Sequence, residues 1–121
     1  MAKEYYLWLD DIRHPPKVEG QVWRWARSFE EVRDLIKKHG VPVAMSVDFD
    51  LDEIYDEEEY YEYTGLDVLK WIHENNKWPS YMSVHSANPV GAERMENFID
   101  DFAPTDVTLY EYRYFYQKKG W

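Results

Sequence analysis

Two short stretches, Leu7-Trp8-Leu9-Asp10-Asp11 and Ser46-Val47-Asp48-Phe49-Asp50, decide both the fold and the candidate site. Each is an apolar run of strand length that ends on aspartates. In a parallel α/β sheet the carboxyl ends of the strands lie side by side, and ligands bind in the crevice beyond them. We therefore expect these carboxylates to converge. Converging carboxylates repel one another unless a divalent cation lies between them, and hard oxygen ligands suit Mg²⁺ or Mn²⁺.

The composition bounds the class of protein. The chain has 121 residues, of which 45% are hydrophobic and 18% aromatic, and this predicts one folded domain over residues 1–121. Cysteine is absent, so disulfides, thiolate catalysis and cysteine-ligated zinc are excluded. No apolar stretch is long enough to cross a bilayer, and the first residues lack a signal-peptide pattern. We therefore expect a cytoplasmic protein with no membrane partner.

The negative charge is concentrated in one segment. The formal net charge is −10, and nine acidic residues with no basic residue lie between Asp48 and Tyr63, leaving −1 for the rest of the chain. A protein that binds DNA regardless of sequence presents clustered lysine and arginine, so this class is excluded. We predict an acidic loop at about residues 51–63, either as a solvated lid or as a segment whose tyrosines stack on a base.

The hydrophobic periodicity predicts alternating strands and helices. Strands are expected at residues 5–10, 21–27, 42–48, 81–85 and 107–116. Helices are expected to follow the N-cap residues Ser28, Thr64 and Asn88, the last with Pro89 in its first position. Their ends are predicted near Gly40, Asn75 and Ala103. This order predicts an α/β fold with a mostly parallel five-stranded sheet and three main helices.

The first and last helices of a five-stranded doubly wound fold are missing from this pattern. In that fold they pack together on one face of the sheet, so we expect an incomplete sandwich with one poorly covered face. On this face we expect aromatic residues, including Tyr6, Trp8, Trp23 and Trp25. They either form an interface with a partner, such as a second copy of the chain, or are half covered by loops. The connection between the first two strands is short for a parallel crossover, so an antiparallel second strand is an alternative.

Four segments of the chain resemble those of a known family. They are Leu9-Asp10-Asp11-Ile12-Arg13-His14-Pro15, Ser46-Val47-Asp48-Phe49-Asp50-Leu51, Thr64-Gly65-Leu66-Asp67-Val68-Leu69-Lys70-Trp71-Ile72 and His85-Ser86-Ala87-Asn88-Pro89-Val90-Gly91. Together they resemble the cyclic-phosphate-processing receiver-like domains, which are divergent relatives of the receiver domains of two-component signalling. The resemblance implies a receiver/flavodoxin-like fold and a phosphorylated ligand, such as a nucleotide or an RNA end.

The leading interpretation is a metal-assisted phosphoesterase. Its predicted metal ligands are Asp10, Asp11, Asp48 and Asp50, with Asp48 and His85 as catalytic residues. The predicted phosphate-binding groups are Arg13, Ser86, Asn88 and Gly91, the last two at a helix N-terminus, and His14 is a possible accessory residue.

Two alternatives stay open from the sequence. The family pattern usually has a histidine where this chain has Phe49, and its loss favours an inactive module that binds a nucleotide or phosphate, or a pure interaction domain. The other is a degenerate receiver that accepts a phosphoryl group at Asp48. The lysine expected after the fifth strand of a receiver is absent, since Lys118 and Lys119 come too late.

Overall fold

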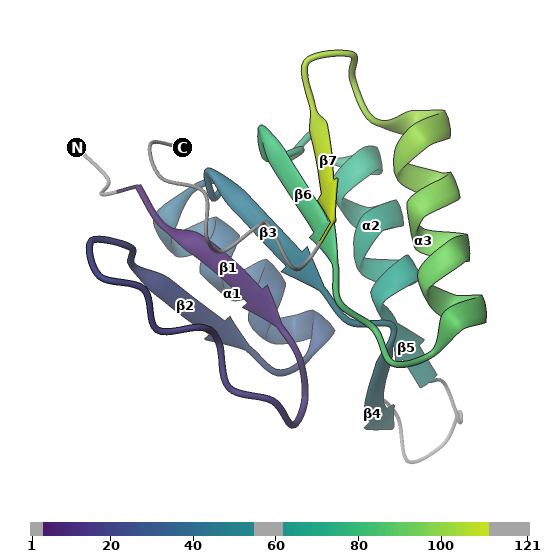
Figure 1. Ribbon diagram of the computed structural model, residues 1–121, viewed down its shortest axis with the longest axis horizontal. Coiled ribbons are helices and arrows are strands. Elements are labelled where there is room, and N and C mark those ends of the chain that lie inside the picture. Colours follow the sequence, from purple (N-terminus) through teal and green to yellow (C-terminus); the bar gives the residue numbers. More distant parts are fainter. Residues whose placement is uncertain (1–3, 55–61, 112–121) are drawn as a thin grey trace.

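A parallel five-stranded sheet forms the centre of the protein in the computed structural model, which describes residues 4–54 and 62–111. The strands are β1 (Tyr6–Leu9), β2 (Trp23–Ala26), β3 (Ala44–Val47), β6 (Tyr81–Val84) and β7 (Thr108–Glu111). They are ordered β2-β1-β3-β6-β7, and all neighbouring pairs are parallel (Figure 1). The α/β fold predicted from the sequence is confirmed.

The antiparallel alternative for the second strand is wrong. Strand β2 pairs with β1 in parallel, with Tyr6 opposite Trp23 and Leu9 opposite Ala26. The return connection needs no helix because the strands are short: four residues span roughly 13 Å at about 3.3 Å per residue. The loop formed by residues 10–22 is long enough to cover that distance in extended form.

Three helices follow the N-caps that the sequence predicted: α1 (Phe29–His39), α2 (Gly65–Glu74) and α3 (Pro89–Phe102). The Ser28 side chain accepts from the N–H of Glu31 at 3.1 Å. Asp67 accepts from the N–H of Thr64 at 2.8 Å, completing a capping box, and Asn88 accepts from the N–H of Gly91 at 3.0 Å. Side-chain acceptors therefore fix where each helix begins.

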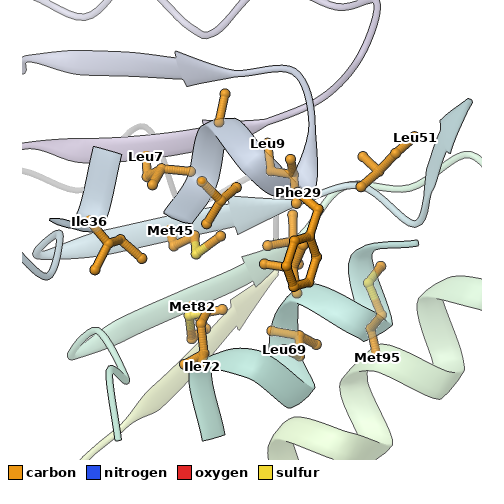
Figure 2. Packing of buried hydrophobic residues seen from close by; sticks show 14 of the residues in the cluster. Leu7, Leu9, Phe29, Ile36, Met45, Leu51, Leu69, Ile72, Met82 and Met95 are labelled. Carbon is orange, nitrogen blue, oxygen red and sulfur yellow. The ribbon is translucent and has the colours of Figure 1, made fainter. Parts of the chain in front are cut away.

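All three helices lie on one face of the sheet (Figure 1). Leu7 and Leu9 of β1 alternate with outward residues and pack with Met45, Val47 and Met82 against the helices. Leu69 and Ile72 of α2 and Ile36 of α1 belong to the same cluster, and Figure 2 shows them with Leu7, Leu9, Met45 and Met82. Met95 joins the same cluster from α3. The core therefore lies between the sheet and a single helical layer.

The opposite face of the sheet carries no helix among the described residues, as the sequence predicted. We call it the open face. Strand alternation places Tyr6 and Trp8 there on β1, beside Trp23 and Trp25 of β2. A second copy of the chain on this face stays a prediction. The sequence also predicts a row of alternating tyrosines on the last strand, Tyr110, Tyr112, Tyr114 and Tyr116, of which only Tyr110 falls within the described residues.

Residues at both ends of the predicted acidic loop form a hairpin. Strands β4 (Asp50–Ile54) and β5 (Glu62–Thr64) pair antiparallel directly after β3 (Figure 1). Residues 55–61, on which the lid and base-stacking interpretations mainly depend, lie outside the described residues. Within the described ranges, every helix is too short or too polar to span a membrane.

Candidate functional site

Three carboxylates converge at the carboxyl ends of β1 and β3. Asp10 and Asp11 follow β1, and Asp48 follows the neighbouring strand β3. One oxygen of each lies within 4.8 Å of the others, in a cluster that could hold a metal ion. The ladder continues past the last strand residue, because the N–H of Asp48 donates to the carbonyl of Leu9 at 3.0 Å. The sheet itself therefore brings the carboxylates together.

Asp10 is held on both of its oxygens. Oδ1 accepts from the backbone N–H groups of Ile12 and Arg13, at 2.9 and 2.8 Å, and Oδ2 contacts His85 Nε2 at 3.1 Å. Burial by itself would raise the pKa of Asp10, but the hydrogen bonds from His85, Arg13 and Ile12 outweigh it and lower the pKa. Asp10 is therefore a buried carboxylate stabilised in its ionised form.

Asp48 has the opposite electrostatic character. Burial is the main cause that raises its pKa, and the neighbouring charge of Asp10 raises it further. The charge of His85 and a hydrogen bond with Ser86 offset part of this effect. The pKa values of two carboxyl groups on adjacent strands are thus shifted in opposite directions, which is typical of acid–base and metal sites.

His85 lies on the open face rather than in the pocket beside the carboxylates. Its ring reaches across β3 and stacks on Trp8, with ring centroids 3.7 Å apart and planes within 4° of parallel. Nδ1 contacts Ser46 Oγ at 2.7 Å, and Nε2 contacts Asp10. Because its side chain is only 1% exposed and both nitrogens are engaged, His85 is placed to hold Asp10. Proton transfer by His85 stays a prediction.

A cavity of about 460 Å³ opens beside the carboxylates. Leu51, Tyr63 and Thr64 of the β4–β5 hairpin line one side, and the loop after β1 lines another with Ile12 and Arg13. The sequence analysis predicted a loop here and not a hairpin, because a strand as polar as β4 carries no periodic apolar signal. Asp50 lies at this cavity, although the three-carboxylate cluster does not include it.

Gly65 is a site residue that the sequence analysis missed. A Cβ atom on it would overlap the carbonyl oxygen of Asp48 and would come within 2.8 Å of Met95 Sδ. Its N–H donates to the carbonyl of Phe49 at 2.8 Å. The first turn of α2 therefore touches the backbone that presents Asp48. The segment Thr64-Gly65 was one of the family segments, but nothing local in it reveals this contact.

The predicted phosphate-binding residues do not all gather at one point. Arg13 lines the cavity with a half-exposed side chain, and its Nε lies 3.9 Å from Asp10 Oδ2. Ser86 accepts from the N–H of Asn88 at 3.1 Å and also bonds to Asp48. Both Ser86 and Arg13 are therefore close to the carboxylates.

The N-terminus of α3 is occupied by protein atoms. The Asn88 side chain caps Gly91 and also donates to Asp50 Oδ2 at 3.4 Å. A Cβ on Gly91 would overlap the ring of Phe49, so the absence of a side chain at Gly91 allows this ring to pack directly against α3. Phosphate binding by Asn88 and Gly91 stays a prediction. His14 packs on Trp25 and lines a separate cavity of about 540 Å³.

Comparison with known proteins gives one match. Residues 5–101 match the family model described as "Cyclic-phosphate processing Receiver domain", which covers well over half of the chain. No curated protein and no solved structure gives a significant match.

Proposed function

The chain belongs to the cyclic-phosphate processing receiver family, and from this premise we propose that it acts on the phosphate of a nucleotide or an RNA end with the help of a divalent cation. Asp10, Asp11 and Asp48 are the proposed ligands of the cation, and the phosphate would enter the adjoining cavity. Asp50, at the same cavity, is a further proposed ligand.

The convergence of three carboxylates beside a cavity is the observation that carries this proposal. Their oxygens lie close enough to share one ion, and the chemistry of an all-carboxylate donor set fits Mg²⁺ or Mn²⁺. A cation there would relieve the repulsion between Asp10 and Asp48 and would favour ionised Asp48. When bound, it would polarise a phosphoryl oxygen and lower the pKa of a bound water.

The surrounding residues would bind and orient the phosphate. The Arg13 guanidinium at the cavity can donate two parallel hydrogen bonds to phosphate oxygens. Ser86 bonds to Asp48 and can fix its orientation. Of the two predicted catalytic residues, Asp48 lines the cavity, whereas the side chain of His85 is enclosed, so Asp48 is the one placed to act beside a bound phosphate.

The test is turnover of cyclic phosphates. The full chain is incubated with 2′,3′-cyclic and 3′,5′-cyclic nucleotides and with RNA ending in a cyclic phosphate, with Mg²⁺, Mn²⁺ or EDTA. Metal-dependent product that Asp48→Asn and Asp11→Asn abolish supports the proposal. Asp34→Asn, on the exposed surface of α1, is the matched control and should keep its activity. Turnover that is unaffected by EDTA and by both site variants would refute a metal-assisted reaction.

A second candidate is a module that binds the phosphate without converting it. The engaged ring nitrogens of His85 favour it, as does Phe49 at the position where the family usually has a histidine. A cyclic nucleotide that raises the melting temperature with Mg²⁺ and is recovered intact would support this function. The degenerate receiver instead requires modification of Asp48 by acetyl phosphate, which mass spectrometry detects.

A further inference from the structure

Side chains from the open face hold the backbone of the acidic turn, residues 10–13. Trp25 Nε1 donates to the carbonyl oxygen of Asp10 at 2.7 Å, and Trp8 Nε1 donates to that of Arg13 at 2.8 Å. Arg27 donates from Nη2 and Nε to the carbonyl oxygen of Asp11, at 2.9 and 3.2 Å. The carbonyls of both adjacent aspartates therefore accept hydrogen bonds from side chains of the β2 region.

These hydrogen bonds take the place of a helix after β1. Helical carbonyls accept from N–H groups four residues further on, whereas the acidic turn leads into an extended loop and lacks this support. The donors are themselves held in place. The Arg27 guanidinium lies 5.0 Å from the Trp25 ring centroid, and the Arg27 N–H donates to Glu31 at 3.0 Å. The β2 end and the start of α1 thus form a fixed support for the turn.

We propose that Trp25 and Arg27 are positioning residues for the acidic pair Asp10 and Asp11, and that they set its affinity for a divalent cation. This proposal rests on the proposed function, because it needs the cation to bind there. Neither residue contacts the cation; each fixes a carbonyl and thereby the direction in which the adjoining carboxylate points. Ligand groups must be held to within roughly 0.5 Å for a tight site, which a freely moving turn does not achieve.

The two residues allow separate and opposed tests. Trp25→Phe keeps an aromatic ring at this position but removes the indole N–H that donates to Asp10, together with the pyrrole part of the indole. Arg27→Met removes the donors to Asp11 together with a positive charge. By electrostatics alone, loss of that charge would strengthen cation binding, whereas loss of positioning weakens it. A decrease in affinity in Arg27→Met therefore separates the two effects by its sign.

The matched control lies on the same strand. Trp23 Nε1 donates to Gln21 Oε1 at 2.9 Å, two residues before it in the sequence. Trp23→Phe therefore makes the same chemical change without altering the support of Asp10. Mn²⁺ affinity of the full chain is measured from the free-ion signal in electron paramagnetic resonance, and folding is checked by circular dichroism.

We expect Trp25→Phe and Arg27→Met each to weaken Mn²⁺ binding roughly tenfold, as outer partners of metal ligands usually do, and Trp23→Phe to bind like the wild type. If Trp25→Phe and Arg27→Met bind Mn²⁺ as tightly as the wild type, the positioning role is refuted and the proposed metal site is unaffected. A wild type that binds no Mn²⁺ would overturn the proposed metal site, and this proposal with it.

A second measurement uses the wild type alone and does not depend on whether the variants fold. In a ¹H–¹⁵N spectrum of the wild type, the indole N–H signals of Trp25 and Trp8 should move on addition of Mg²⁺, while that of Trp23 stays within its line width. Equal shifts for Trp23 and Trp25, or none for Trp25, would contradict the link between these indoles and the acidic turn.

Discussion

Gly65→Ala provides a direct test of how α2 positions Asp48. The new Cβ would overlap the carbonyl oxygen of Asp48 and press on Met95 Sδ at 2.8 Å, whereas real Cβ contacts shorter than 3.0 Å are essentially never seen. The first of these is a backbone atom that cannot rotate away. The α2 N-terminus and the Asp48 segment must therefore separate by something on the order of 1 Å, and such overpacking costs about 1–3 kcal/mol of unfolding free energy.

The same displacement should affect the site more than the fold. For a chain of this size a loss of about 2 kcal/mol lowers the melting temperature by roughly 8 °C, which leaves the protein folded at 25 °C. Displacement of a ligand by about 1 Å exceeds the roughly 0.5 Å tolerance of a tight site and can cost about 100-fold in function. We therefore expect Mn²⁺ affinity to fall by at least about tenfold in a variant that still unfolds cooperatively.

Gly40→Ala is the control for this experiment. Gly40 has a φ of 85° and a ψ of −177°, a conformation that essentially only glycine adopts, so alanine is strained there by roughly 1–3 kcal/mol, yet nothing lies within 4 Å of the new Cβ. This residue follows α1, at the opposite end of β3 from Asp48. The two variants should lose comparable stability, and only Gly65→Ala should lose metal affinity. Wild-type affinity in Gly65→Ala would refute the role of this contact in placing Asp48.

Three further predictions concern single contacts. Gly91→Ala should cost about 1–3 kcal/mol by overlap with Phe49, and Phe49→Ala in the same chain should recover part of that loss in urea unfolding. Folding raises the pKa of Asp48, so ionised Asp48 destabilises the folded protein. This destabilisation is absent below the unfolded-state pKa and is complete once the pH has risen through the folded-state pKa. In EDTA at pH 7 the unfolding free energy of Asp48→Asn should therefore exceed that of the wild type, and the two should become equal at acidic pH. Ser46→Ala should cost about 1–3 kcal/mol by removing the hydroxyl partner of a buried ring nitrogen of His85. Ser83→Ala removes a buried hydroxyl that has no hydrogen-bond partner among the described residues, and it should be neutral or stabilising by thermal denaturation.

The sequence predicted those parts of the fold that depend on local periodicity. The three helices begin after Ser28, Thr64 and Asn88, as expected. The accepting side chains are those of Ser28, Asp67 and Asn88, and each such bond joins residues only three positions apart. The meeting of Asp10 and Asp48 was also predictable, since it needs only two adjacent parallel strands that end at the same level.

The direction in which His85 points was available in the sequence but was not used. Tyr81, Ser83 and His85 alternate with the core residue Met82, so strand parity places the histidine on the open face. Asp10 and Asp48 continue the same parity on their own strands, one position after the core residues Leu9 and Val47. These three side chains therefore form one row, and the histidine was more predictable as a partner of Asp10 than as a group facing a ligand.

Contacts between distant segments were beyond the reach of pattern analysis. Phe49 meets Gly91, and Gly65 meets the backbone of Asp48, through loops whose paths are set by tertiary packing. The parallel course of β2 depended on how far an irregular loop reaches. In each case the deciding quantity is a distance in space, and no period or spacing in the sequence encodes it.

The charges around the cavity imply that an anion and a cation would bind together. Among the residues that the structure describes, four carboxylates line it, from Asp10, Asp11, Asp48 and Asp50, against one guanidinium from Arg13. A phosphate entering alone would meet net negative charge in a partly buried setting, where repulsion is poorly screened. A cation on the carboxylates removes that repulsion and adds an attraction, and by linkage the phosphate strengthens cation binding by the same factor. The acidic cluster that would repel a free phosphate is thus, in the proposed function, what makes phosphate binding depend on the metal.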